Sequence, residues 1–262
     1  MKMNDTQRCL WRRAVATWAL VAGALIVFSV DARGQAMPEA MPSAKSMMDW
    51  GRVSFILFDE LEYVPGDKGR PISFEGLGWY GGAYNRLWFR TEGEQNTAGG
   101  GGAAEVEFLF GRLISPYWDA VTGVRYDRRW DERNDGRALF AVGILGEAPL
   151  RFEFAPTLFI SSDGDISARL DASYQFLFTQ RLILEPSIDL NAAARAVPEF
   201  GVGTGLNEAV LATRLRYEIR RKFGPYVGVA WTKKVGSTAD LARAEGGDAS
   251  GVNLVFGLRV WR

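Results

Sequence analysis

Residues 207–220 read N-E-A-V-L-A-T-R-L-R-Y-E-I-R, and this stretch decides the fold. Successive side chains of a β-strand point to opposite faces, so alternate residues share a face. The apolar face would carry Ala209, Leu211, Thr213, Leu215, Tyr217 and Ile219, and the charged face Glu208, Arg214, Arg216, Glu218 and Arg220. Arginine and glutamate mix on the charged face, and aromatic and aliphatic residues fill the other. The pattern therefore predicts a strand of a closed membrane barrel, with lipid outside and a polar lumen inside.

Similar alternation recurs along the chain. The predicted strands are 51–63, 72–79, 83–92, 104–114, 118–130, 137–146, 151–161, 166–178, 181–192, 207–220, 226–235 and 251–261. In the last run, Phe256 and Leu258 face the lipid and Arg259 faces the lumen. The region 73–92 fits one long strand or two, and an even strand number requires two. We therefore expect an all-β fold in which residues 50–262 form a transmembrane antiparallel β-barrel of twelve strands.

The connections between these runs are of two kinds. Those at 115–117, 147–150, 178–180 and 221–224 are tight, whereas those at 91–102, 193–206 and 236–250 are long and rich in Gly, Ala and Thr. The short loop at 163–165 is an exception on the side of the long ones. Short periplasmic turns and longer extracellular loops are typical of outer-membrane barrels, so both termini are expected to face the periplasm.

The first 36 residues have the three parts of a secretory signal peptide. These are a basic start with Lys2, Arg12 and Arg13, an uncharged apolar run over 14–30, and small residues that end at Ala36. A membrane anchor helix is the alternative, but the run is short for a span. We expect cleavage after Ala36, followed by a short disordered periplasmic segment over 37–49.

Composition excludes several function classes. The 31 basic and 31 acidic residues balance, so bulk charge gives no sign of nucleic-acid binding. The chain has no histidine, and its single cysteine, Cys9, precedes the apolar run. If the signal is removed, neither a thiolate nor an imidazole remains to bind a metal or activate a nucleophile. We therefore do not expect an enzyme.

Six segments resemble the copper-resistance protein B family, which are outer-membrane barrels of Gram-negative bacteria. They are F-D-E-L-E-Y (58–63), G-W-Y-G-G-A-Y-N-R-L-W-F-R-T-E-G-E (78–94), S-P-Y-W-D (115–119), S-Y-Q-F-L-F-T-Q-R-L-I-L-E-P (173–186), L-R-Y-E-I-R-R-K-F-G-P-Y-V-G-V (215–229) and G-S-T-A-D-L-A-R (236–243). The resemblance implies a role in copper homeostasis at the bacterial outer membrane. It also implies copper ions as ligand and periplasmic copper oxidase or carrier proteins as partners.

The chain departs from this family in its metal-binding residues. Family members often carry Met- and His-rich segments before the barrel, and histidines within it. Here the family's N-terminal ligands carry over only to Met37, Met41, Met47 and Met48. Thioethers select Cu(I), although a linker with incidental methionines is the alternative. The aromatic residue expected at the C-terminus is also missing, because Arg262 follows Trp261.

Acidic residues near the first strands are the second candidate ligands. They are Asp59, Glu60, Glu62, Glu92 and Glu94. Carboxylates such as the first three could hold Cu(II) or guide cations through a lumen. The alternative is that these residues neutralise Arg86, Arg90, Arg125 and Arg128 inside the barrel. Two functions stay open at this point: a copper-handling barrel, or a small general pore or structural barrel without metal specificity.

Overall fold

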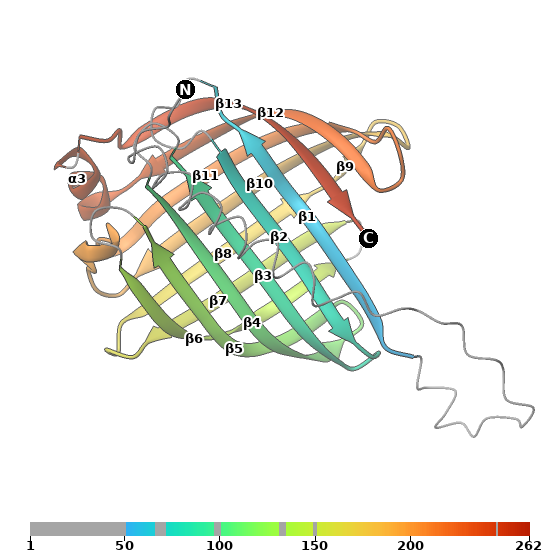
Figure 1. The fold of residues 1–262 in the computed structure, drawn as a ribbon, viewed down its shortest axis with the longest axis horizontal. Helices are drawn as coiled ribbons and strands as arrows, with labels where there is room; N and C mark the ends of the chain where they lie inside the picture. The colour runs from blue at the N-terminus through green and yellow to red at the C-terminus, as the bar shows by residue number, and fades with distance from the viewer. Residues whose placement is uncertain (1–50, 66–71, 97–100, 131–134, 149–150, 245) are drawn as a thin grey trace, which may run out of the picture. The chain divides into compact units, whose positions relative to one another are not determined.

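The computed structural model describes residues 51–262 except 66–71, 97–100, 131–134, 149–150 and 245. Within this part of the chain, one antiparallel sheet closes on itself as a barrel (Figure 1). The predicted signal peptide at 1–36, the segment 37–49 and all the methionines lie outside the described residues. No helix among the described residues has the length and apolar character needed to cross a membrane.

The strands follow one another around the barrel in chain order. They are β1 (Val53–Tyr63), β2 (Ile72–Gly81), β3 (Asn85–Gln95), β4 (Gly102–Ser115), β5 (Trp118–Arg129), β6 (Gly136–Ala148), β7 (Phe152–Ser161), β8 (Ile166–Tyr174), β9 (Phe176–Leu177), β10 (Leu182–Ala193), β11 (Gly205–Tyr217), β12 (Phe223–Lys234) and β13 (Ser250–Trp261). Both β8 and β9 pair with β10, and only Gln175 separates them, so they form one interrupted strand. The first strand, β1, pairs with the last, β13, and closes the barrel. The predicted twelve-stranded antiparallel barrel is therefore confirmed.

Alternation of side chains produces the two surfaces of this wall. On β11, Leu215 is 37% exposed and Tyr217 is 49% exposed, whereas Arg216 between them is 5% exposed. On β13, Phe256 and Leu258 are likewise exposed and Arg259 is buried. The predicted facing of these strands is confirmed. The outer surface is apolar around the barrel, as a lipid-facing wall must be.

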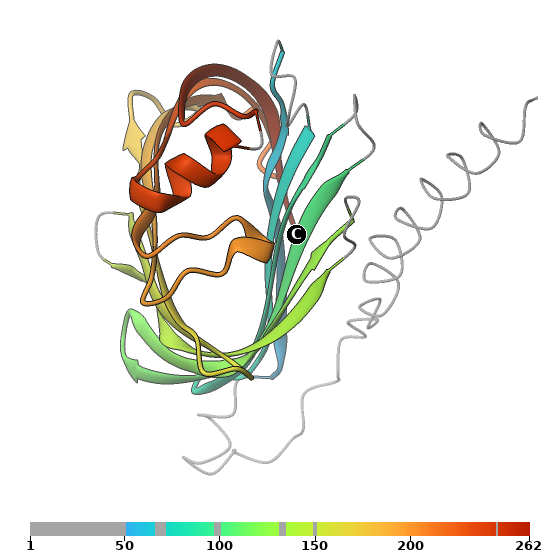
Figure 2. The same cartoon turned by 90° about the vertical axis from the view of Figure 1, so that its left-hand side faces the viewer.

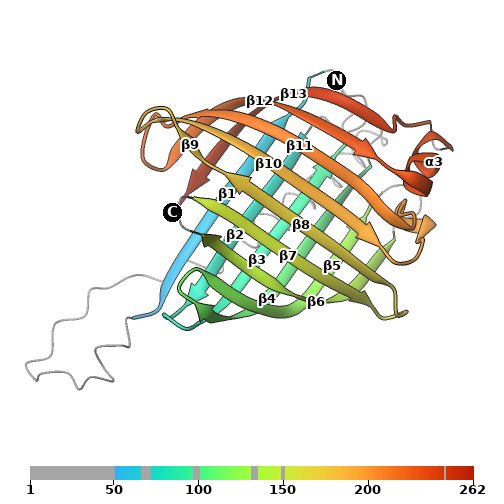
Figure 3. The same cartoon turned by 180° about the vertical axis from the view of Figure 1, so that it is seen from behind.

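Part of the interior is apolar rather than charged. A cluster inside the wall formed by β4 to β7 consists of Leu109, Val121, Leu139, Ala141, Leu145 and Phe159. Arg125 caps this cluster, with its guanidinium carbon 4.5 Å from the centre of the Phe159 ring. The remaining lumen is lined by ionisable side chains, which are described below. Figure 3 shows β7, β8, β10 and β11 side by side on the wall that faces β1 to β4.

Short turns lie at the barrel end where β1 begins and β13 ends, which we call the terminus end, and longer connections lie at the other end. Two of the longer connections contain helices: the 3₁₀ helix η1 (Pro198–Phe200) between β10 and β11, and α3 (Gly236–Ala244) between β12 and β13. Figure 2 looks toward this end and shows both segments lying across the barrel mouth. The connection over 236–250 was predicted as a loop, so α3 is a finding of the structure.

Candidate functional site

A row of carboxylates crosses the inner wall from β1 to β5. The strand register places Glu60 opposite Glu75, Glu75 opposite Glu92, Glu92 opposite Glu105, and Glu105 opposite Asp127. Like charges directly opposite each other on neighbouring strands are destabilising. The row therefore needs positive charge from elsewhere in the barrel, and arginines supply it.

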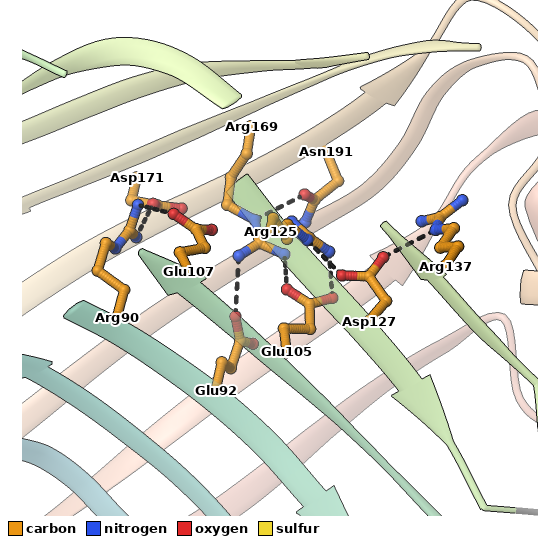
Figure 4. A network of polar contacts seen from close by, with 10 residues as sticks. All are labelled: Arg90, Glu92, Glu105, Glu107, Arg125, Asp127, Arg137, Arg169, Asp171 and Asn191. Carbon is orange, nitrogen blue, oxygen red and sulfur yellow. Dashed lines mark hydrogen bonds and ion pairs between the residues drawn. The ribbon is translucent and has the colours of Figure 1, made fainter. Parts of the chain in front are cut away.

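Arg169 on β8 is the centre of the first group of ion pairs. It reaches across the lumen, with Nη1 3.1 Å from Glu92 Oε2 and Nη2 2.6 Å from Glu105 Oε2 (Figure 4). Its Nε donates to Asn191 Oδ1 on β10 over 3.2 Å. One guanidinium thus links β3, β4, β8 and β10, which lie on opposite walls.

Two more arginines extend this group. Arg90 crosses from β3 to β8, where its Nη2 donates to Asp171 Oδ2 over 2.7 Å. Arg125 pairs with Glu105 and donates from Nε to Asp127 Oδ1 over 2.5 Å. Asp127 also accepts a hydrogen bond from Arg137 Nε over 2.8 Å. Multiple charge-assisted bonds of this kind offset the cost of removing the charges from water.

Carboxylates nevertheless outnumber arginines in what we call the Arg169 network. Its members are the arginines Arg90, Arg125, Arg137 and Arg169 and the carboxylates Glu75, Glu92, Glu105, Glu107, Asp127 and Asp171. Glu75 lines the same small cavity as Arg90 and Arg169, but it makes no ion pair with any described residue. Glu107 is 2% exposed, its Oε2 accepts no hydrogen bond, and Arg90 Nη1 lies 3.7 Å away. The network therefore has two more carboxylates than arginines.

A second group, the Arg214 network, lies closer to the terminus end of the barrel. Its members are Arg214, Arg216 and Arg259 with Asp59, Glu60, Glu62, Glu185 and Glu218. Glu185 accepts hydrogen bonds from Arg216 Nη1 over 2.6 Å and from Arg259 Nη1 over 2.9 Å. Carboxylates again exceed arginines, so both networks make the lumen attractive to cations.

A β-bulge in β1 explains how the predicted acidic residues reach the lumen. Phe58 is opposite Gly76, but Glu60 is opposite Glu75, so β1 has one extra residue at Asp59. The pairing of β1 with β13 shows the same extra residue. A bulge shifts the alternation by one position. Asp59, Glu60 and Glu62 can therefore all point inward, which strict alternation would not allow.

The structure places the sequence-predicted site residues as follows. Asp59 pairs with Arg259 Nε at 2.8 Å, while Glu60 and Glu62 both pair with Arg214, at 2.6 and 2.7 Å. The carboxylates are thus neutralised by arginines, but by different ones from those we predicted. Among the described residues, no three carboxylates converge closely enough to hold a metal ion. The candidate ligands Met37, Met41, Met47 and Met48 lie outside the described residues.

Arg86, predicted to be a lumen ion-pair partner, has this role. Its Nη1 is 3.0 Å from Asp119 Oδ2, and the Trp88 indole donates to the same oxygen over 3.1 Å. Arg86 also lies over the Trp79 ring, 5.0 Å from its centre. These contacts hold the β2–β3 hairpin against β5 near the terminus end.

The other mouth is crossed by the connection over 194–204, which we call the mouth strap. It leaves the wall at β10 and β11 and reaches β5 and β6, where Arg129 Nη1 donates to the Glu199 carbonyl over 3.0 Å. At the tip of the strap, the guanidinium carbon of Arg137 lies 4.2 Å from the centre of the Phe200 ring. Because Arg137 also binds Asp127, the strap is connected to the Arg169 network.

Helix α3 holds the strap from the other side. Gly203 N donates to Thr238 Oγ1 and Thr204 N donates to Ser237 Oγ, each over 2.9 Å. A side chain on Gly203 would collide with the backbone of Thr238, since an added Cβ would lie 2.4 Å from its nitrogen. Glycine at this position therefore allows the strap to pack closely on α3.

Comparison with known proteins identifies the family. The model of the family described as Copper resistance protein B precursor matches residues 52–262, which is the whole barrel. The chain belongs to the copper resistance protein B family. Copper resistance protein B of Escherichia coli is 40% identical over 206 residues, covering 79% of this chain and 68% of that protein. The Copper resistance protein B homolog of Pseudomonas syringae pv. tomato is 39% identical over 208 residues, covering 79% of this chain and 69% of that protein. The resemblance inferred from the six segments is confirmed.

A solved barrel shares the fold at much lower identity. The NanC porin is similar with a TM-score of 0.50 and 13% identity, over 80% of this chain and 100% of that chain. At this identity the likeness concerns the fold alone. It agrees with the closed antiparallel barrel described above.

The copper resistance protein B segments now have structural roles. F-D-E-L-E-Y is the bulge of β1, and the segment over 78–94 is the β2–β3 hairpin with Arg86, Arg90 and Glu92. G-S-T-A-D-L-A-R over 236–243 is most of α3. Sequence reasoning missed the role of Glu75, Glu105 and Arg169 in the lumen. The alternation of their strands indicated which way they face, but no sequence signal indicated their partners across the lumen.

Proposed function

We propose that this chain is an outer-membrane barrel of copper homeostasis that binds or passes copper ions, and that it is not an enzyme. The observation that carries the proposal is the excess of lumen carboxylates over arginines in a member of the copper resistance protein B family. Negatively lined lumens concentrate cations and exclude anions. Copper is here the cargo, and the lumen carboxylates attract it rather than hold it in a fixed coordination site.

The exported segment supplies the second part of the proposal. Met37, Met41, Met47 and Met48 bind Cu(I) weakly, because thioethers are soft ligands and the exported chain has no thiol or imidazole to compete. With the termini on the periplasmic side, this segment exchanges copper with periplasmic oxidase or carrier proteins. Cu(I) titration against a competing chelator tests it, comparing the intact protein with a variant carrying leucine at all four positions. Equal titration of the two proteins would remove the methionine site from the proposal.

Copper tolerance of a deletion strain tests the role of the lumen. The strain is complemented with the wild-type gene or with a variant carrying Glu60→Gln, Glu75→Gln and Glu92→Gln. The matched control removes three exposed acidic charges from the loop end, with Asp163→Asn, Asp240→Asn and Asp248→Asn. We expect the lumen variant to fail in complementation and the control to succeed.

One observation favours a second candidate, a structural barrel without metal specificity. Ion pairs from Arg90 and Arg169 cross the lumen, and the mouth strap lies over one end. If the deletion strain tolerates copper as well as its parent, this second function replaces the first.

A further inference from the structure

The barrel end where β1 begins and β13 ends carries a cluster of exposed cations. We name it the cationic rim, and it consists of Arg181, Arg220, Arg221, Lys222 and Arg262. Arg181 precedes β10, the three consecutive cations form the turn between β11 and β12, and Arg262 follows β13. Backbone hydrogen bonds connect these positions: Glu218 N donates to Arg181 O over 2.8 Å, and Trp261 N donates to Lys222 O over 3.4 Å. The five cations therefore lie on neighbouring strands.

No acidic side chain among the described residues neutralises this rim. None of its five side chains makes an ion pair or hydrogen bond with another described residue. The nearby Glu218 is directed toward Arg216, 3.9 Å from its Nε. At the opposite end, by contrast, the exposed Arg243 pairs with Asp240 at 2.9 Å. Uncompensated like charges repel one another, so the rim is suited to an anionic partner.

The neighbours of the rim indicate where that partner lies. Phe178 is 63% exposed, Tyr217 is 49% exposed and Ile219 is 51% exposed, and each lies within three residues of a rim residue in sequence. They continue the apolar outer wall of the barrel to its edge. Aromatic residues followed by Arg and Lys at the edge of an apolar wall are typical of the depth at which lipid headgroups lie.

We propose that the cationic rim binds the headgroup phosphates of anionic phospholipids in the leaflet around this end of the barrel. Arginine forms bidentate hydrogen bonds with phosphate, and basic residues at a membrane edge are attracted to an anionic leaflet. A soluble acidic protein is the other kind of anionic partner. The rim favours lipid because it follows the curved wall over four strands and is continuous with the apolar surface.

The test compares two triple variants of the full chain purified from membranes. R220Q/R221Q/K222Q removes three rim charges, and R195Q/K233Q/R243Q removes three exposed charges from the opposite end. Each protein is equilibrated in mixed micelles with equal phosphatidylglycerol and phosphatidylcholine, and the retained lipids are counted by native mass spectrometry. Heat-modifiable migration on gels confirms that each variant is folded.

We expect the wild-type protein and the opposite-end variant to retain phosphatidylglycerol in preference to phosphatidylcholine. In the rim variant, the ratio of retained phosphatidylglycerol to retained phosphatidylcholine should fall at least about fivefold. A fivefold fall is the effect expected from the loss of one basic residue at an anionic surface. If the rim variant does not fold, about 0.5 M NaCl should remove the preference from the wild-type protein by screening. A wild-type protein without lipid preference, or a rim variant that keeps it, overturns the proposal. The proposal is also overturned if the rim binds an acidic soluble protein but shows no preference for phosphatidylglycerol.

Discussion

Asp59 and Glu60 are adjacent in the chain, yet both carboxylates meet arginines inside the barrel. The β-bulge that allows this is the residue-scale device on which the acidic lumen depends. The sequence predicted that these side chains are candidates for ion pairs or metal binding, because charge is unusual in a membrane barrel unless it faces the lumen. It did not predict the bulge. Residues 59–62 read D-E-L-E, and in so short a run of mostly acidic residues one extra residue cannot be recognised from the sequence pattern.

The first prediction concerns Arg214, which is 13% exposed and pairs with both Glu60 and Glu62. Arg214→Ala leaves two carboxylates without a partner, so the free energy of unfolding should fall by about 3 kcal/mol. Urea unfolding of the barrel refolded in detergent micelles measures it. Adding Glu62→Gln should restore part of the loss, and Arg243→Ala, in an exposed pair, should change little. A double variant as unstable as the single one would show that lost packing, not unpaired charge, is responsible.

At the scale of elements, the strands were predictable and the helix was not. Every strand of the barrel has ten or more residues once β8 and β9 are joined, and side chains alternate along it except at bulges such as the one in β1. Helix α3 has only nine residues, and the Gly, Ser and Thr at its start suggested a loop. Its alanines and its leucine favour a helix, and packing on the strap and on β11 stabilises it.

The second prediction tests the outer face of β11. Leu211, at the middle of the strand, and Tyr217, at its last residue, both face outward. Leu211→Arg should destabilise the barrel by about 2–4 kcal/mol, whereas Tyr217→Arg should cost about 0–1 kcal/mol, because the penalty for a cation falls toward the membrane interface. Urea titration of the two variants folded in lipid vesicles measures the difference. Equal losses would contradict the placement of β11 across the membrane.

The third prediction concerns the contact between the mouth strap and α3. Gly203→Ala should separate the strap from α3 and break the two hydrogen bonds between them. Together these bonds contribute about 2 kcal/mol, so their loss should increase the population of an open mouth on the order of thirtyfold. Ion conductance in planar lipid bilayers should therefore rise. Gly82→Ala is the control, because an added Cβ at that turn meets no atom within 4 Å. Unchanged conductance in Gly203→Ala would mean that the lumen ion pairs, and not the strap, limit passage.

At the scale of the whole molecule, charge is segregated although its sum is zero. Both lumen networks have more carboxylates than arginines, and the cationic rim gathers unpaired basic residues at the terminus end. Alternation predicted which charges face inward, except at the bulge of β1. It did not predict that Arg169 on β8 meets Glu92 on β3, because strand tilt and the cross-section of the barrel decide which residues face each other across the lumen. For the same reason, the arginines that neutralise Asp59, Glu60 and Glu62 were not those predicted.

The last prediction follows from this segregation. The lumen should select cations, and Glu75, the member of the acidic row without an arginine, should be the most sensitive position. Because the Arg169 network has two more carboxylates than arginines, Glu75→Lys makes its acidic and basic groups equal in number. The reversal potential across a KCl gradient should then fall by roughly half or more. Asp163→Lys makes the same charge change in an exposed loop and should leave selectivity nearly unchanged. If both variants reduce selectivity equally, the charge at the mouth, rather than the acidic row inside, controls which ions enter.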